Sequence, residues 1–319
     1  MGTKNVDLLQ DLKNRVNGAL AEPTVQEYLG SPELVWGPAL CEQDKLSSNT
    51  LHVVRIEDTY VIATAGTNPI SVYDWAVEDF DVSKQVDWPH RQHIRPGLHP
   101  KIAEGTNIGL NFLLEMKSNG QTLIDFLNDL MTKENKVSLT VTRYSLGGAL
   151  SPTLALNLLD RQDEWDHGKP VEIKVLPFAG PPPGNADFAT YYDQRLGLHT
   201  KRIWNNIDIV PYFREKDLLE TIPSLYEPYI KWNMLVKGLV HKAIQNASAG
   251  GNYKQLVPHT KPLQGEWSWQ RLAPSGSQSD EEKKAVEKQK KKLEEALNEA
   301  VERMVNKFSP CLVKLPTST

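Results

Sequence analysis

The clearest pattern along the chain is a short alternation of apolar and polar residues that passes into a continuous apolar run. Val137, Leu139 and Val141 alternate with polar residues and predict a strand, and the run at 149–159 predicts a helix. Ser145 stands between them and is followed by glycines. Strand, sharp turn with serine, then helix is the layout of a nucleophile elbow, in which a strained backbone lifts the hydroxyl clear of the sheet.

Other parts of the chain alternate between strand and helix patterns in the same way. Apolar residues at helical spacing predict helices, and period-two alternation or short apolar runs predict strands. Strands that alternate with helices indicate an α/β fold, with a mostly parallel sheet and helices on both faces. The expected elements are helices at 4–20, 108–116, 122–131 and 186–197 and strands at 51–56, 60–65, 171–178 and 201–211.

Three chemically suggestive positions fall at the ends of predicted strands. Gly66-Thr67 follows the strand at 60–65, Ser145 follows the strand that begins at Val137, and Asp208 lies near the end of the strand at 201–211. Sites in parallel sheets gather at the carboxyl ends of the strands. Taken alone, Gly66-Thr67 is also consistent with a plain turn. The coincidence of all three positions predicts a site at this edge.

A long polar and aromatic connection covers residues 80–101. Loops of this length in compact domains are usually functional or mobile. Trp88 and Ile94 stand among prolines, and we expect them to form a flap over an apolar site. His90, His93 and His99 lie in the same stretch, where a surface cluster is favoured over a metal site because carboxylate or cysteine ligands are lacking.

Composition narrows the class of protein. The chain has 319 residues, 39% of them hydrophobic, and a net charge of −4, which argues against nucleic acid as a partner. Cys41 and Cys311 are too few for a disulfide framework. The N-terminus has no apolar signal region and no apolar run is long enough to span a membrane, so we expect a cytoplasmic protein unless a signal was removed.

The end of the chain changes character. We expect one domain at 1–270, a linker at 271–280, and a charged amphipathic helix with its tail at 281–319. The apolar stripe of that helix would pack on the domain or on a partner. Its members are Leu293, Ala296, Leu297, Ala300, Val301, Met304 and Val305.

Four segments, in order, resemble the class 3, fungal-type lipases of the α/β-hydrolase fold. They are Ala65-Gly-Thr with Asp74-Trp75, the segment from Val141 to Leu150, Phe178-Ala-Gly-Pro with Gly184-Asn185, and Asn205-Asn-Ile-Asp-Ile-Val-Pro. The resemblance covers roughly residues 50–215. It implies an α/β-hydrolase-like fold and a hydrolase of lipid acyl esters, with a lipid or small acyl-ester substrate, transient contact with a lipid surface, and no metal or cofactor.

The resemblance also assigns roles to individual residues. Ser145 would be the nucleophile, and Asp208 the acid that orients the base. The backbone N–H groups of Thr67 and Leu146 would form the oxyanion hole. A histidine would take the proton from Ser145, an acyl-enzyme would form, and water would release the acid.

Two features depart from the family pattern. The family has the sequence Gly-His-Ser-Leu-Gly where this chain has Arg143-Tyr144-Ser145-Leu146-Gly147. The bulky side chain of Arg143 should crowd the neighbouring strand or helix. Related sequences also place the triad histidine near the C-terminus, and the tail here contains none. His259, in the loop 256–262, is therefore the substitute candidate, because a loop residue can reach across strand ends.

Three readings stay open at this point. The first is an esterase or lipase that uses Ser145, Asp208 and His259. The second is a non-catalytic lipase-like protein that binds an acyl ligand or a partner, suggested by Arg143, Tyr144 and the histidine-free tail. The third is acyl transfer to an acceptor other than water, which the sequence does not separate from hydrolysis.

Overall fold

The structure is a computed structural model that describes residues 3–40, 50–65, 84–225 and 251–265, and single helical residues between 241 and 295. Thr67 and the connection up to residue 83 lie outside the described residues. So do the 271–280 linker and the apolar stripe of the C-terminal segment, of which residues 284, 288, 291 and 295 are described as helical and exposed.

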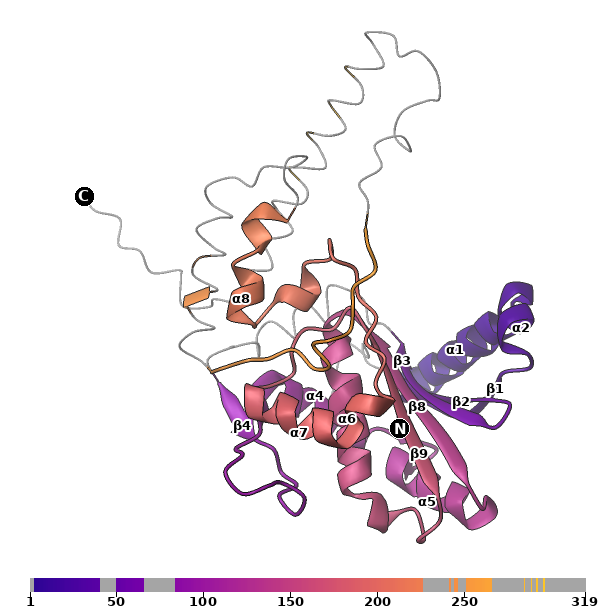
Figure 1. Cartoon of the computed structure of the whole chain (residues 1–319). Helices are drawn as coiled ribbons and strands as arrows, with labels where there is room; N and C mark the ends of the chain where they lie inside the picture. Colours follow the sequence, from indigo (N-terminus) through magenta and orange to yellow (C-terminus); the bar gives the residue numbers. More distant parts are fainter. Residues whose placement is uncertain are drawn as a thin grey trace.

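A seven-stranded mixed sheet forms the centre of the molecule (Figure 1). Its strand order is β7-β6-β1-β2-β3-β8-β9, and β4 and β5 form a separate small sheet. The strands are β1 (Glu33–Leu40), β2 (Thr50–Ile56), β3 (Thr59–Ala65), β4 (Gln85–Asp87), β5 (Lys101–Ala103), β6 (Lys117–Ser118), β7 (Gln121–Thr122), β8 (Val137–Tyr144) and β9 (Val171–Phe178).

The two halves of this sheet differ in strand direction. From β7 to β3 the neighbours run antiparallel, whereas β3, β8 and β9 run parallel to one another. Parallel bridges continue the sheet beyond β9, joining Val175 to Thr200, Phe178 to Ile203 and Asn205 to Leu263. The parallel half is the one that ends in Ser145.

Helices cover the sheet on both sides. They are α1 (Thr3–Leu20), α2 (Pro23–Leu29), α4 (Glu104–Glu115), α5 (Leu123–Lys133), α6 (Leu150–Asp160), α7 (Ala186–Leu196) and the short α8 (Lys216–Leu219). In Figure 1, α4, α6 and α7 lie together beside β8 and β9, and α1 lies on the other side, next to β1. The α/β-hydrolase-like architecture expected from the sequence is confirmed.

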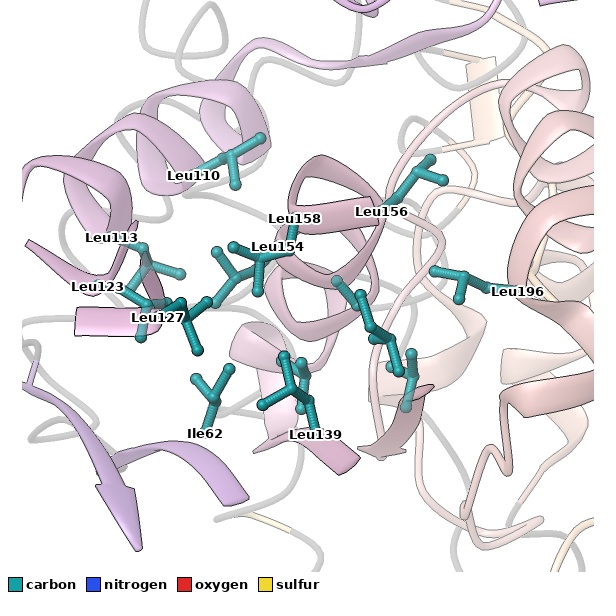
Figure 2. Close-up of a cluster of buried hydrophobic side chains, with 14 of the residues drawn as sticks. Ile62, Leu110, Leu113, Leu123, Leu127, Leu139, Leu154, Leu156, Leu158 and Leu196 are labelled. Carbon is teal, nitrogen blue, oxygen red and sulfur yellow. The ribbon is translucent and has the colours of Figure 1, made fainter. Parts of the chain in front are cut away.

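The core lies between the parallel strands and the helices α4 to α7. Every core-facing position of β8 is buried, in alternation with half-buried positions, as the apolar–polar pattern predicts. Helix α6 is buried on nearly every side, which explains its apolar run. Figure 2 shows leucines of α4, α5 and α6 grouped near Ile62 and Leu139 of the sheet, whereas Leu156 and Leu196 lie between α6 and α7.

Two sequence expectations about elements need correction. The strand expected at 201–211 is reduced to single bridges at Ile203 and Asn205, because the chain turns at 206–208 and a 3₁₀ turn begins at Val210. Strand β1 was not predicted. Gly37 and Pro38 interrupt it, and both residues argue against a strand when only the sequence is read. Its register shifts around these positions.

The flap expected at Trp88 is also wrong. Trp88 is buried in the core and holds the connection at 84–100 against the helices. Its side chain is only 1% exposed and belongs to the core. Its indole N–H donates to the buried carboxyl group of Asp160 at the end of α6, at 2.8 Å. Tyr191 and Arg195 of α7 donate to the same carboxyl group, at 2.8 and 3.2 Å. Residues 84–100 are thereby fastened to α6 and α7.

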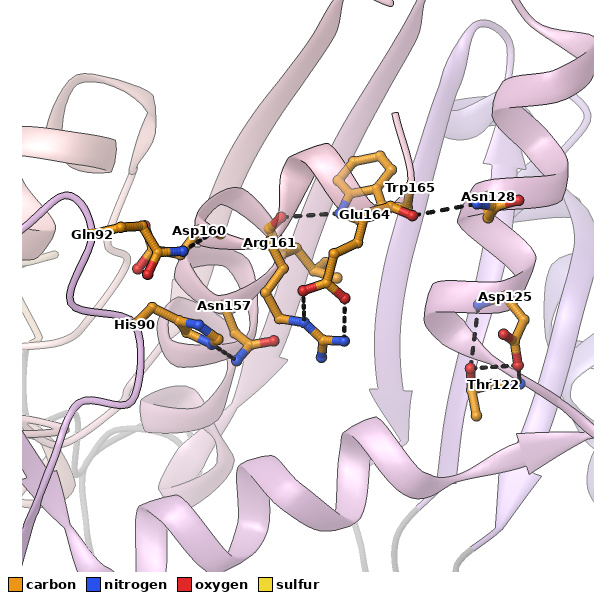
Figure 3. A network of polar contacts seen from close by, with 11 residues as sticks. His90, Gln92, Thr122, Asp125, Asn128, Asn157, Asp160, Arg161, Glu164 and Trp165 are labelled. Atoms are coloured by element: carbon orange, nitrogen blue, oxygen red, sulfur yellow. Dashed lines mark hydrogen bonds and ion pairs between the residues drawn. The ribbon is translucent and has the colours of Figure 1, made fainter. Parts of the chain in front are cut away.

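The surroundings of this anchor add further polar contacts (Figure 3). The side chain of Gln92 donates to the backbone carbonyl of Asp160, at 3.3 Å. His90 receives a hydrogen bond from the Asn157 amide at 2.8 Å and packs edge-on against Trp88. Burial lowers the pKa of His90. This histidine is therefore engaged in the packing of the connection against α6.

Candidate active site

Ser145 occupies the strained position that a nucleophile elbow requires. It follows β8 directly and opens a 3₁₀ turn, Ser145–Ala149, that leads into α6. Its φ angle is +64°, in the left-handed region that costs a non-glycine residue about 1–3 kcal/mol. Strain of this kind persists only where the surrounding structure holds it, and it clusters at functional sites.

A close backbone approach behind the turn helps to hold that strain. Gly148 packs on Gly180, which follows β9: a Cβ atom on Gly148 would lie 2.6 Å from the Gly180 Cα atom. A Cβ atom on Gly180 would lie 2.5 Å from the carbonyl carbon of Gly148. Neither position therefore has room for a side chain. The first turn after Ser145 lies directly on the backbone that leaves the neighbouring strand.

The structure resolves the crowding expected from Arg143. Its side chain is 6% exposed and lies against Gly147, where a Cβ atom would come within 1.9 Å of the Arg143 Nε atom. The space that a side chain at position 147 would occupy is thus filled by the Cδ, Nε and Cζ atoms of Arg143. The bulky residue fits because the last residue of the pentapeptide is glycine. Burial lowers the pKa of Arg143 to about 10, so its guanidinium is still charged at pH 7.

Asp208 lies where the chain turns after the parallel bridges. It is half-buried, and its Oδ1 atom accepts the backbone N–H of Val210 at 3.0 Å. Burial raises the pKa of Asp208, and the hydrogen bond from Val210 opposes that shift in part. The Tyr212 hydroxyl nearby donates to the Asn206 carbonyl, at 2.8 Å. The carboxyl group is held by the loop itself.

His259 has a different neighbour. It is exposed on a turn closed by the hydrogen bond from the Thr260 N–H to the Val257 carbonyl, at 3.0 Å. Its charge acts on Asp193 of α7, where it helps to lower a carboxyl pKa that burial raises. Asp193 lies seven residues into α7, about 10 Å along the helix from the end next to β9. Asn205 and Leu263 form a parallel bridge. His259 precedes this bridge on its own segment, whereas Asp208 follows it on the neighbouring segment.

The remaining histidines stand elsewhere. All eight histidines of the chain fall within the described residues, and none of them contributes to the pKa of Asp208. His52 lies on β2 with a pKa lowered by burial, and His241 is exposed and helical. Within the part of the chain that the structure describes, Ser145 directly follows β8 and Asp208 follows the parallel bridges beyond β9.

Gln255 is a site-supporting residue that sequence reasoning did not find. Its side-chain amide donates to the carbonyls of Gly180 at 3.1 Å and Pro211 at 3.2 Å. Gly180 packs on the elbow and Pro211 follows Asp208, so Gln255 joins the nucleophile turn to the acid loop. It is 5% exposed and lies in irregular chain, where no periodicity distinguishes it. Only its contacts reveal the role.

The described residues contain no helix long and apolar enough to cross a membrane. Among these same residues, no group of three or more histidine, cysteine, aspartate or glutamate side chains is arranged to hold a metal ion. The backbone of Leu146, the first expected oxyanion donor, lies within the 3₁₀ turn after Ser145. The second expected donor, Thr67, is outside the described residues.

Comparison with known proteins identifies relatives of this chain. A family model described as lipase (class 3) matches residues 61–217. The crystal structure of M37 lipase is 35% identical, with a TM-score of 0.71, and the match covers 81% of this chain and 78% of that one. Phospholipase A1-II 1 of Oryza sativa subsp. indica is 28% identical over 160 residues, 47% of this chain and 38% of that protein.

A second curated relative gives a similar picture. Phospholipase A1-IIbeta of Arabidopsis thaliana is 27% identical over 188 residues, which are 54% of this chain and 44% of that protein. The chain thus spans less than half the length of these two plant relatives. M37 lipase, by contrast, is matched over more than three quarters of its length, with the same fold. On these grounds the chain belongs to the class 3 lipase family.

Proposed function

We propose that this protein is a serine hydrolase of lipid acyl esters, with Ser145 as nucleophile. The observation that carries the proposal is the positive φ of Ser145 at a strand–turn–helix junction. Such a position presents the hydroxyl at the carboxyl edge of the parallel strands, where sites of this fold class gather. The relatives support the ester class, because their names describe a lipase and phospholipases A1.

The proposed chemistry is acyl transfer through an acyl-enzyme. Ser145 attacks the ester carbonyl as the base takes its proton, and the N–H of Leu146, together with that of Thr67, stabilises the oxyanion. The base passes the proton to the departing alcohol, and water then hydrolyses the acyl-enzyme to release the acid. Asp208 orients the base. We assign the base to His259, which must reach Asp208 and Ser145 from its present place beside Asp193. We also propose that the protein binds its substrate during transient contact with a lipid surface.

A second candidate function follows from the position of His259. A triad needs its base within hydrogen-bond reach of the nucleophile, and removing one member forfeits most of the rate enhancement. Two residues before His259, the Val257 N–H donates to Asp193 at 3.1 Å, and no histidine of the described residues contributes to the pKa of Asp208. This geometry favours a lipase-like protein that keeps the elbow and binds an acyl ligand without turning it over.

The two candidates separate in one assay. Hydrolysis of short- and long-chain p-nitrophenyl esters is measured for the wild type, Ser145→Ala and His259→Ala, with His199→Ala, an exposed histidine, as the matched control. Release that is lost in Ser145→Ala and retained in His199→Ala supports the hydrolase, and its loss in His259→Ala assigns the base. The absence of Ser145-dependent release from folded protein contradicts the hydrolase and supports the ligand-binding alternative.

A further inference from the structure

The elbow holds a contact that the family pattern does not contain. Where the family has glycine at both ends of the pentapeptide, this chain has Arg143 at the first position and Gly147 at the last. A Cβ atom at position 147 would lie 1.9, 2.4 and 2.7 Å from the Nε, Cδ and Cζ atoms of Arg143. These are the three nearest heavy atoms to that position. The arginine stem and the missing side chain are complementary in shape.

The direction of Arg143 follows from its place on β8. Buried and less buried positions alternate along the strand, and Arg143 falls on the same face as Val137, Leu139 and Val141. Side chains on that face point towards the helices. Arg143 pairs in register with Pro177 of β9, so its backbone is fixed on that side. Its side chain therefore passes beneath the first turn after the strand and cannot leave without moving that turn.

The turn above Arg143 carries the reacting groups. Ser145 and Leu146 lie between Arg143 and Gly147 in the sequence, and the Gly147 carbonyl accepts the N–H of Leu150 at the start of α6. A shift of Gly147 is thus transmitted to Leu146, whose N–H is the expected oxyanion donor. Misplacing a catalytic group by about 1 Å can cost a factor of about 100 in rate.

We propose that Arg143 is a positioning residue, whose buried Cδ, Nε and Cζ atoms, seated against Gly147, fix the position of the Ser145–Leu146 turn. The inference rests on the proposed function, because its consequence is a rate. Arg143 does not touch the substrate; it acts through Gly147. In this chain the Arg143–Gly147 contact takes the place of the glycine that the family pattern has at the first position.

A double-mutant cycle tests the contact. The variants are Arg143→Gly, Gly147→Ala and their combination, each assayed for kcat and KM with a p-nitrophenyl ester and for thermal unfolding. Gly18→Ala is the matched control for the added methyl group, since nothing lies within 4 Å of a Cβ atom there. Arg143→Lys, which keeps a long stem and a charge, is the conservative variant.

Each single substitution breaks the same contact, so we expect each to lower kcat about tenfold or more with KM little changed. The double variant should lose no more than the worse single variant, because removing Arg143 makes room for the alanine methyl group. Arg143→Lys should recover most of kcat, and Gly18→Ala should match the wild type. A purely structural role would lower the unfolding temperature without changing kcat of the folded protein.

The outcomes that contradict the inference are distinct from those that contradict the function. Losses in kcat that multiply in the double variant, or variants at position 143 with wild-type kcat, overturn the positioning role while Ser145-dependent turnover still stands. A wild-type protein without Ser145-dependent turnover overturns the proposed function, and the positioning role falls with it.

Discussion

The proposed nucleophile and its two proposed partners are held in different ways. Ser145 lies between β8 and α6, where an eight-residue parallel ladder to β9 and the contact of Gly148 with Gly180 fix the backbone. Asp208 and His259 lie on described segments that pair with the sheet through single bridges, and Leu256 and Val257, just before His259, belong to the hydrophobic core. The elbow geometry is therefore set by regular elements, whereas the segments of Asp208 and His259 are held by single bridges, polar contacts and a few core side chains.

This difference identifies where the site is preformed and where it is adjustable. A backbone pressed between strands has one arrangement, because close-packed interiors do not deform continuously. The irregular segments that carry Asp208 and His259 have fewer backbone pairs with the sheet than β8 has.

The largest effect is expected where the elbow side is anchored. Asp160→Ala removes the acceptor for Trp88, Tyr191 and Arg195, and losing one partner of a buried, hydrogen-bonded charge pair costs about 3–5 kcal/mol. Urea unfolding should show a loss of that order. Asp163→Ala, at an exposed position nearby, is the control and should stay within about 0.5 kcal/mol of the wild type. Equal losses in both variants would show that the anchor adds nothing.

A smaller effect is expected at the link between the two regions. Gln255→Leu leaves the carbonyls of Gly180 and Pro211 without their donor, which should cost about 1–3 kcal/mol. Amide hydrogen exchange should rise around Asp208 and remain unchanged along β8. Lys261→Leu, at an exposed position of the same segment, provides the comparison. Faster exchange in β8 as well would contradict the separation between the two regions.

Because Ser145 is strained, a substitution that relieves the strain should stabilise the folded protein even though it removes the proposed nucleophile. Ser145→Gly should raise the free energy of unfolding by about 1 kcal/mol, because glycine adopts a positive φ without steric cost, and it should abolish ester turnover. Glu57→Gly relieves the same kind of strain, at φ +50°, in the β2–β3 turn. It should gain similar stability and keep full turnover. A loss of stability in Ser145→Gly would show that the elbow is not strained.

The smallest effect is expected from the charge of Asp208. Burial raises its pKa above the ordinary value of 3.8, so the folded protein binds this proton more tightly than the unfolded chain does. The resulting stabilisation is full below about pH 3.8 and is lost as the pH rises through the folded pKa. Asp208→Asn removes this dependence. Relative to the wild type, its free energy of unfolding should increase between pH 4 and pH 8; a difference that stays constant would contradict the burial effect.

Much of the fold could be predicted from local patterns. The strand at 171–178 and the helices α1, α5 and α7 follow from apolar periodicity, because the spacing of apolar residues indicates which face of an element is buried. Strand β1 could not be predicted, since Gly37 and Pro38 contradict the strand pattern and only its pairing with β2 supports it. The strand at 201–211 was overestimated, because its apolar residues also suit a half-buried loop.

The sequence by itself determined the nucleophile turn, because strand, serine, glycines and helix are consecutive and their geometry is local. Only the tertiary structure decided what surrounds that turn. Arg143 fits because Gly147 leaves room, Trp88 is held because Asp160 accepts its indole N–H, and the turn with His259 lies beside α7 because the Val257 N–H donates to Asp193. Contacts between residues far apart in the chain depend on packing, which no local pattern encodes.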